Sequence, residues 1–473
     1  MISFFSALAI LLIGYIFYGR LTEKIFEPDE RTTPAINQKD GVDFVPIPKW
    51  KAFLIQLLNI AGTGPIFGAL MGAAFGPVVF LWITFGSILG GAVQDYLTGM
   101  ISERNGGASI AELSGIYLGK SARIIMRIFS VVLLLLVGTV FVTSPASLLA
   151  RLTPESLGTK FWTVIILIYY VLATMLPIDK VIGKFYPLFG IALILMATGI
   201  IAGLFIGGYK IPEITLTNMH PEGLPVWPYM FVTVACGAIS GFHATQSPLV
   251  SKCMTSEKQG RSIFYGAMIA EAVIALVWAA AGTAFYVNSN ELLKALTDFG
   301  QSAVVYEISS GLMGKMGGIL AIIGVVACPI TSGDTAFRSA RLILAEWTGL
   351  KQDKLKNRLI LTLPLLTIGA VLTQVNFNVL WRYFSWSNQT LAMIALWCAA
   401  AYFIKNGKSL SFLLPALPGT FMTAVSVTYI MMTKEGLNLP SSIAYPVGII
   451  SAFAAFVWCC IFAYKCYRYA ILS

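Results

Sequence analysis

Three of the 22 acidic side chains in this sequence lie inside apolar stretches long enough to cross a lipid bilayer: Asp95, Glu271 and Asp334. A carboxylate loses the stabilisation of water in such a stretch, so it has to pair with a partner, take up a proton or line a path for water. Intramembrane acids therefore mark routes for ions and protons. We interpret these three residues as candidates for proton or cation coupling.

Asp334 stands in a run that is rich in hydroxyl groups, with Thr331, Ser332 and Thr335 close to it in the chain. Carboxylate and hydroxyl oxygens bind hard cations. The run therefore predicts either a Na⁺ site formed by the three hydroxyls or a proton relay through the acid. The alternative is that Asp334 forms an ion pair with Arg338, one helical turn later, and only stabilises the helix.

Asp95 and Glu271 differ in their predicted depth. Asp95 lies toward the cytoplasmic end of its span, where it could cap the helix or form an ion pair with a loop residue such as Arg104. Glu271 lies near the middle of its span, where a purely structural carboxylate is harder to accommodate. For Glu271, a gating or proton-relay role and a structural role both stay open.

His243 is one of two histidines and lies two residues after Gly241, at the predicted break in an apolar stretch. An imidazole can donate a hydrogen bond to a carboxylate or change its protonation near neutral pH. We predict that it contacts substrate together with Ser240, Gly241 and Gln246, which lies further along the same helix. Packing in the core is the alternative for the histidine.

Asn388 and Gln389 form a polar pair inside another apolar helix. Amide side chains in a membrane need hydrogen-bond partners, which a substrate or a neighbouring helix can supply. We include both residues among the predicted substrate contacts, and interhelical hydrogen bonding is the alternative.

Two breaks in apolar stretches are expected to position these side chains. Gly62, Gly64 and Pro65 interrupt the stretch 50–75, because glycine carries a high backbone entropy cost in a helix and proline lacks an amide donor. A freed backbone group costs several kcal/mol in hydrocarbon, so protein, an ion or a substrate has to occupy the gap. We expect Gly62, Thr63 and Gly64 to contact substrate, and the carbonyl groups freed at Asn59 and Ala61 to contact the coupling ion.

The second break lies at 236–243, and Gly241 follows Gly62 by 179 residues. Two glycine-interrupted spans in corresponding halves of a chain indicate the binding site of a secondary transporter. The expected mechanism is alternating access, in which the positive ends of the half-helices at 63–66 and 241–243 face a carboxylate.

The composition is that of an all-α polytopic membrane protein. Hydrophobic residues make up 57% of the chain, charged residues make up 11% and the mean hydropathy is +0.79. In globular domains, charged residues make up roughly a quarter of the chain. A length of 473 residues accommodates about a dozen spans of ~20 residues and predicts a single membrane domain, 1–473.

Thirteen spans are predicted from apolar runs bounded by charges, proline and glycine. They lie near 3–19, 50–75, 77–101, 121–149, 161–178, 185–208, 227–250, 261–287, 317–345, 357–374, 377–404, 411–433 and 442–464. One set of the resulting loops holds 25 of the 32 Lys and Arg residues. Since cytoplasmic loops carry this excess, we predict an outside N-terminus and a cytoplasmic C-terminus.

The net charge of +10 follows from the same loops, which face anionic lipid, so we expect the bilayer and no nucleic acid as a partner. The spans also predict an inverted repeat of five plus five, with 50–208 and 209–404 as its halves. Residues 1–49 add one span and a cytoplasmic loop, and residues 405–473 add two spans. No particular oligomeric state is indicated.

Enzyme motifs are missing from the sequence, which contains no GxxxxGK[ST] loop, no HExxH pair and no GxSxG turn. We therefore expect no enzyme activity and no cofactor besides a coupling ion, H⁺ or Na⁺. The seven cysteines show no spacing that indicates a disulfide framework or a metal site.

Six short stretches, in the same order, resemble the carbon starvation protein A (CstA) family. They are GVDFVP at 41–46, AGTGP at 61–65, GAVQD at 91–95, RNGGAS at 104–109, SGFHA at 240–244 and SNQ at 387–389. The resemblance implies a prokaryotic inner-membrane nutrient transporter, induced on carbon starvation, with a LeuT-like inverted repeat. It also implies uptake of peptides or pyruvate by proton symport, with substrate between the broken helices and Thr331, Ser332 or Thr335 near a cation position.

Two features depart from the family pattern: Gln56 stands where larger members have a histidine, and the 331–335 run is richer in hydroxyls. Proton and sodium both stay open as the coupling ion. The leading hypothesis is an ion-coupled importer of a small carboxylate-bearing nutrient. A membrane nutrient sensor without net transport and an intramembrane enzyme are the alternatives.

The substitution Asp334→Asn tests the coupling role of this acid. It is expected to abolish gradient-driven accumulation of substrate in proteoliposomes while partly preserving counterflow, because it removes a titratable group and keeps the shape of the side chain. Full accumulation by this variant would show that Asp334 has no part in coupling.

Overall fold

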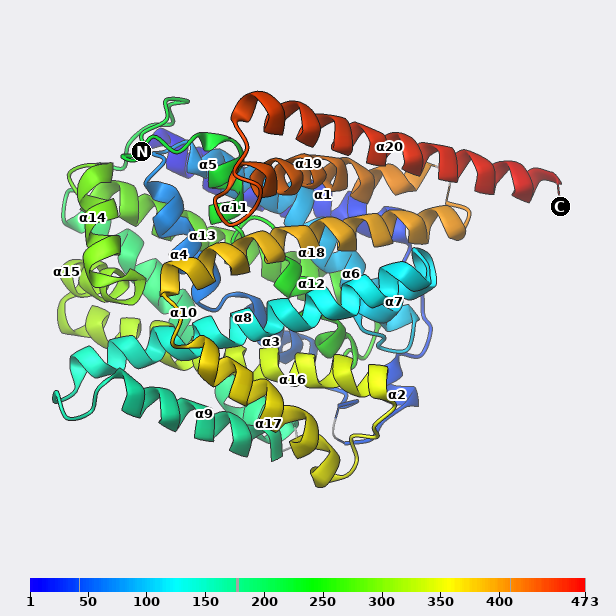
Figure 1. Ribbon diagram of the computed structural model, residues 1–473, viewed down its shortest axis with the longest axis horizontal. Coiled ribbons are helices and arrows are strands. Elements are labelled where there is room, and N and C mark those ends of the chain that lie inside the picture. The colour runs from blue at the N-terminus through cyan, green and yellow to red at the C-terminus, as the bar shows by residue number, and fades with distance from the viewer. Residues whose placement is uncertain (42, 176–177, 409, 473) are drawn as a thin grey trace.

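The computed structural model describes residues 1–41, 43–175, 178–408 and 410–472, and it describes no side chains for 175–188 and 469–473. Within these residues the chain folds into helices and forms no strand (Figure 1). Most helices run along the long axis of the molecule, α14 lies at one end, and α2 and α7 lie toward the other. The N-terminus and the far end of α20 lie at opposite ends of this bundle.

The helices follow one another along the chain with short connections. They are α1 (Ile2–Phe26), α2 (Pro34–Asn37), α3 (Lys49–Ile60), α4 (Thr63–Ala73), α5 (Val79–Leu81), η1 (Trp82–Gly91), α6 (Ala92–Arg104), α7 (Ile110–Tyr117), α8 (Lys120–Leu152), α9 (Thr159–Met175), α10 (Ile178–Ile206), η2 (Val226–Met230), α11 (Phe231–Thr233), α12 (Gly241–Ser251), η3 (Glu257–Gln259), η4 (Arg261–Tyr265), α13 (Gly266–Phe285), α14 (Ser289–Phe299), α15 (Gln301–Ile322), η5 (Ile323–Ala327), α16 (Cys328–Thr348), α17 (Leu355–Leu372), α18 (Phe377–Lys405), η6 (Leu410–Phe412), α19 (Leu413–Met432) and α20 (Ser441–Leu472).

Nine helices of the described chain are long and apolar enough to cross a membrane, and the bent pair α3 and α4 raises this number to ten. The protein is therefore a multi-pass membrane protein. The predicted spans 77–101, 161–178 and 227–250 are not among these nine, because the first is divided among α5, η1 and α6, the second contains the shorter helix α9, and the third is interrupted. The number of thirteen spans and the inverted repeat stay predictions.

Both predicted breaks are present in the backbone. Helix α3 ends at Ile60, α4 begins at Thr63, and the two axes differ by 48°. In the second break, residues 234–240 separate α11 from α12, and Gly237 has a φ of +92°, which glycine adopts at little cost. Glycine and proline inside these apolar stretches thus interrupt the helices as expected.

The two breaks lie against each other in the middle of the bundle. A Cβ atom at Gly64 would lie 2.6 Å from Sγ of Cys236, and one at Gly237 would lie 3.4 Å from Cβ of Pro65. Only the absence of a side chain at Gly64 allows this close approach. Residues 172 positions apart in the chain therefore lie together at one site.

Helix η1 is a ten-residue π-helix that packs on the second break. The extra residue per turn of a π-helix re-aims the side chains that follow it, and such segments are frequent at functional sites. A Cβ atom at its last residue, Gly91, would lie 2.2 Å from the carbonyl oxygen of Ala238. Nothing in the sequence analysis predicted this helix type.

The substitution Gly91→Ala is expected to lower the free energy of unfolding by about 1–3 kcal/mol, because the new methyl group would overlap the backbone of the second break. Thermal unfolding of the purified protein in detergent measures this effect. Gly158→Ala is the matched control, since a Cβ atom at Gly158 meets no atom within 4 Å. Equal unfolding midpoints for both variants would contradict the prediction.

Candidate functional site

The centre of the candidate site is a histidine between two carboxylates. Nδ1 of His243, on the first turn of α12, lies 3.0 Å from Oδ2 of Asp95 on α6. Nε2 of the same ring lies 3.4 Å from Oε2 of Glu271 on α13. The three side chains have no exposed surface. A carboxylate, an imidazole and a carboxylate in this order can hold or pass a proton.

The interpretation of Asp95 as a partner of Arg104 is wrong. Arg104 donates from Nε to Oε1 of Glu257 at 2.8 Å, and it also donates to the hydroxyl of Tyr402. Asp95 and Arg104 are nine residues apart on one helix, which separates them by about 13 Å along the axis. Asp95 is too deep in the bundle to reach the loop, and its partner is His243 instead.

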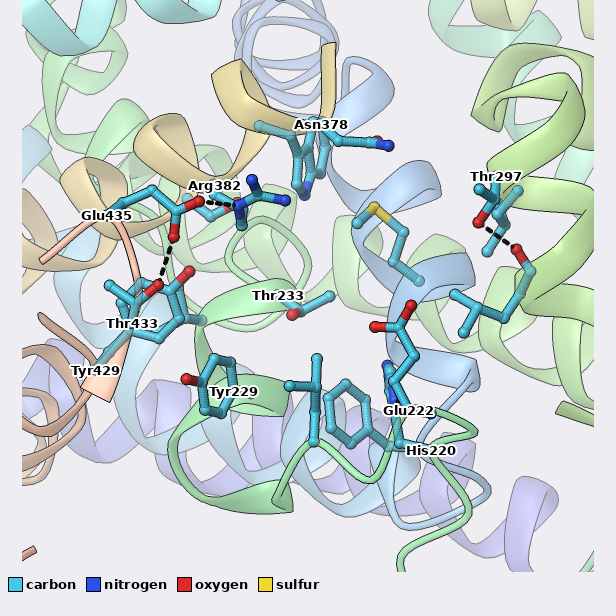
Figure 2. A pocket seen from close by; sticks show the side chains of 18 of the residues that line it. His220, Glu222, Tyr229, Thr233, Thr297, Asn378, Arg382, Tyr429, Thr433 and Glu435 are labelled. Atoms are coloured by element: carbon cyan, nitrogen blue, oxygen red, sulfur yellow. Dashed lines mark hydrogen bonds and ion pairs between the residues drawn. The ribbon is translucent and has the colours of Figure 1, made fainter. Parts of the chain in front are cut away.

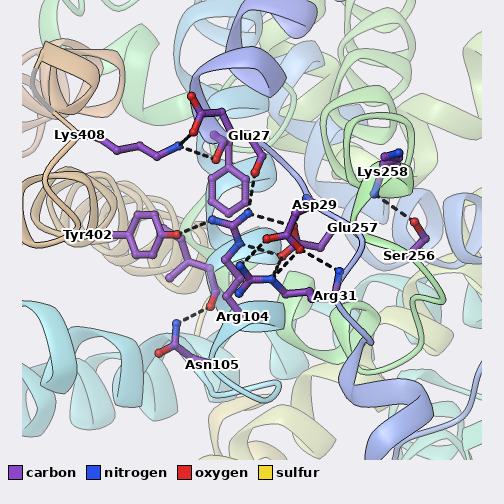
Figure 3. A network of polar contacts seen from close by, with 12 residues as sticks. Glu27, Asp29, Arg31, Arg104, Asn105, Ser256, Glu257, Lys258, Tyr402 and Lys408 are labelled. Carbon is purple, nitrogen blue, oxygen red and sulfur yellow. Dashed lines mark hydrogen bonds and ion pairs between the residues drawn. The ribbon is translucent and has the colours of Figure 1, made fainter.

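Arg104 belongs to a polar network at the end of the bundle that carries α2 and α7 (Figure 3). Arg31 contacts Asp29 through two nitrogens, at 2.9 and 2.6 Å, and Nζ of Lys408 lies 2.8 Å from Glu27. The network ties the segment after α1 to the ends of α6 and α18. It lies on the side that the charge distribution predicts to be cytoplasmic.

Donors from η1 and α6 satisfy the carbonyl groups that the second break sets free. Trp82 donates from Nε1 to the carbonyl of Val234 at 3.2 Å. Ser87 donates to Gly237 at 3.0 Å, and Nε2 of Gln94 donates to Ser240 at 2.5 Å. Sequence reasoning missed these three residues, although Ser87 and Gln94 are polar residues in a predicted span and gave a usable signal.

Asn388 and Gln389 of α18 also hold the second broken helix. Oδ1 of Asn388 accepts from the amide of Phe242 at 2.6 Å and from the hydroxyl of Ser240 at 3.1 Å. Nε2 of Gln389 donates to the carbonyl of Phe231 at 2.8 Å. The interhelical alternative for this pair is therefore present in the structure, and its contact with substrate stays a prediction.

The first break also keeps buried oxygen atoms without partners. Four oxygen atoms on the two broken helices have no hydrogen-bond partner among the described residues: Oε1 of Gln56, Oδ1 of Asn59 and Oγ1 of Thr63 on α3 and α4, and Oε1 of Gln246 on α12. The side chains of all four residues are at most 2% exposed. Unpaired buried polar atoms are costly, and Gln94 and Gln389 beside the second break each keep one such oxygen as well.

The hydroxyl run of α16 lies beside the first break. Ser332 donates to the carbonyl of Leu58 at 3.0 Å, and a Cβ atom at Gly62 would lie 3.1 Å from its Oγ. Thr331 and Thr335 donate to carbonyls within their own helix. Ser332 therefore lies beside the first break, and binding of Na⁺ by the three hydroxyls stays a prediction.

Asp334 takes no part in the contacts of His243. Its Oδ2 lies 3.7 Å from Nη2 of Arg338, and both side chains are 2% to 3% exposed. The ion pair that was the alternative for this residue is thus present. Its role in coupling stays a prediction that the asparagine variant tests.

A cavity of about 430 Å³ lies on the α14 side of the two breaks (Figure 2). Met71 on α4, Thr233 on α11 and Arg382 on α18 contribute to its wall, so it touches both broken helices. Nε of Arg382 donates to Glu435 at 2.6 Å, and Thr433 donates to the same carboxylate. None of the residues predicted from the sequence lines this cavity, because its wall comes from side chains far apart in the chain.

No group of three or more His, Cys, Asp or Glu side chains among the described residues is arranged to hold a metal ion. All seven cysteines are free thiols.

Comparison with known proteins gives one family. The family described as carbon starvation protein CstA matches residues 1–157, 155–310 and 298–429. An uncharacterized membrane protein of Haemophilus influenzae is 43% identical over 350 residues, which cover 63% of this chain and 94% of that protein. The peptide transporter CstA of Campylobacter jejuni is 24% identical, with 94% of this chain and 82% of that protein covered.

The pyruvate/proton symporter BtsT of Escherichia coli is 28% identical over 342 residues, which cover 58% of this chain and 47% of that protein. Among solved structures, the manganese transporter of Eremococcus coleocola is similar, with a TM-score of 0.54 and 13% identity. The similarity covers 90% of this chain and 99% of that one. It shows a shared fold.

The substitution Gln94→Leu is expected to lower the free energy of unfolding by about 1–3 kcal/mol, because the carbonyl of Ser240 would lose its buried donor. Chemical unfolding in detergent measures the change. Gln374→Leu, at an exposed position, is the matched control. A Gln94 variant as stable as this control would show that the second break needs no donor from α6.

Proposed function

Because this chain belongs to the carbon starvation protein CstA family, we propose that it is a secondary active symporter that imports a short peptide or pyruvate. The proton is the coupling ion in this proposal. The protein acts in a prokaryotic plasma membrane, with an outside N-terminus and a cytoplasmic C-terminus. Relatives named as a peptide transporter and as a pyruvate/proton symporter support both substrate classes.

The observation that carries the proposal is the position of His243 between Asp95 and Glu271. The side chains have no exposed surface, so each ionised group in this cluster is costly. Each proton that enters lowers the net negative charge of the cluster. His243 belongs to the first turn of α12. Proton binding therefore changes the relative free energies of the positions that α12 can take, and coupling requires such a change.

We place the proposed substrate-binding position at the first break. The amide of Phe242 at the start of α12 is already bound to Asn388, whereas α4 starts at Thr63 with no cap from a side chain. The amides at the start of α4 therefore suit a carboxylate, which the positive end of a helix stabilises. The unpaired oxygens of Gln56 and Asn59 suit the ammonium group of a peptide or a cation.

In this proposal residues 50–208 and 209–404 form a LeuT-like inverted repeat, and each half begins with a broken helix. Movement of one half against the other would expose the site alternately to the two sides. Na⁺ at Thr331, Ser332 and Thr335 is the competing coupling ion. The hydroxyl of Ser332 lies close enough to the first break to share such an ion with its carbonyl groups.

Uptake of labelled pyruvate and alanyl-alanine into proteoliposomes tests the proposal, with a proton or a sodium gradient imposed separately. We expect an inward proton gradient to drive accumulation. Glu271→Gln is expected to lose at least about tenfold in gradient-driven uptake and to keep exchange of substrate, because the amide cannot release a proton.

Glu155→Gln, in an exposed loop, is the matched control and should accumulate substrate like the wild type. Accumulation that follows only the sodium gradient would reject the proton as the coupling ion. Binding of substrate without accumulation under either gradient would reject transport in favour of a sensor.

A further inference from the structure

Two buried hydrogen-bond donors line the cavity on the α14 side without a partner. Nε1 of Trp381 and Oγ of Ser385 have no hydrogen-bond partner among the described residues, and both side chains are 2% exposed. They stand four residues apart on α18 and therefore share one face of this helix. An indole nitrogen can only donate, so at least one of the two groups requires an acceptor.

Arg382 adds charge to the same wall. Among the described residues, the guanidinium group of Arg382 donates a hydrogen bond from Nε to Glu435. The terminal nitrogens keep N–H groups for a ligand, and the side chain is 44% exposed. Figure 2 shows Arg382 at the cavity, beside its ion pair with Glu435.

Indole, hydroxyl and guanidinium groups together form a set of N–H and O–H donors, in which the guanidinium group also pairs with Glu435. We propose that Trp381, Arg382 and Ser385 form an outer binding site for a free carboxylate, either that of pyruvate or the C-terminal carboxylate of a short peptide. This inference rests on the proposed function and adds a first docking position outside the breaks. Arginine suits such a site because its planar group pairs with both oxygens of a carboxylate.

The outer site is connected to the first broken helix by packing. The ring of Trp381 lies 6.0 Å from the ring of Phe67 on α4, measured between centroids. A ligand that binds the indole nitrogen therefore touches a residue that packs directly on α4. Phe67 follows Thr63 by four residues on α4, so the docking position lies beside the first broken helix.

An acidic residue on the other side of the cavity would interact differently with a short peptide and with pyruvate. Glu222 also lines the cavity, and Figure 2 shows its carboxylate on the side opposite the ion pair of Arg382 and Glu435. A peptide carries an ammonium group that can pair with this acid, whereas pyruvate has none. The carboxylate end is common to both.

Equilibrium binding of labelled pyruvate and of alanyl-alanine to the full chain in lipid nanodiscs tests the site. Trp381→Phe keeps the ring packing and removes the N–H group, and Ser385→Ala removes only a hydroxyl. Each is expected to weaken binding of both ligands by about tenfold, the usual effect of losing one hydrogen bond to a charged group. Alanyl-alanine amide, which lacks the carboxylate, is expected to bind at least as weakly to the wild type.

Trp386→Phe is the matched control, because Nε1 of Trp386 donates to the carbonyl of Ser426 and the residue does not line the cavity. Its affinity for both ligands should equal that of the wild type. Wild-type affinity in both the Trp381 and the Ser385 variant would overturn the inference. Tight binding of the amide would overturn it as well.

Glu222→Gln separates the two sources of the carboxylate. A loss of affinity for alanyl-alanine alone supports a site for peptides, and unchanged affinity for both ligands supports a site for the carboxylate alone. A wild-type protein that binds both ligands but accumulates neither would reject the proposed function and retain the site. A wild-type protein that binds neither ligand would overturn both.

Discussion

The structure depends on the rule that a backbone group freed inside a membrane has to find a partner. Two helices of this chain are broken next to each other, and the groups at the two breaks have different partners. At the second break, Trp82, Ser87 and Gln94 supply donors to three carbonyl groups, and Asn388 supplies an acceptor to the amide of Phe242. At the first break, buried oxygens stay without partners. Protein side chains thus hold the second break, and in the proposed function a ligand completes the first.

The buried histidine follows from the same arrangement. Gln94 and Asp95 are neighbours on α6, and they hold Ser240 and His243, which lie on either side of the start of α12. A single turn of α6 therefore fixes the beginning of the half-helix and the direction of the imidazole ring. Glu271 then reaches the ring from α13. Any movement of α12 has to change these contacts, so the protonation of the cluster and the position of the helix cannot vary independently.

The sequence predicted the parts of this site that leave a local signal. Glycine and proline inside an apolar stretch reveal a break, and an acid in such a stretch stands out, so both breaks and the three acids were found. Pairing is different: Asp95 and His243 are 148 residues apart, and nothing local identifies them as partners. For that reason the sequence did not identify His243 as the partner of Asp95 and left Arg104 among the alternatives. The π-helix and the outer cavity were missed because they arise from packing between distant segments.

Helix α18 connects the outer cavity with the second break. Trp381 and Ser385 face the cavity, and Asn388, which caps α12, follows Trp381 by seven residues, or about 10 Å along the helix axis. A rigid helix transmits a shift at one end to the other. A ligand that displaces α18 at the cavity would therefore alter the hydrogen bond to Phe242, whose neighbour His243 carries the proton in the proposed mechanism. Substrate and proton could act on one another through this helix without direct contact, because both bias the position of the start of α12.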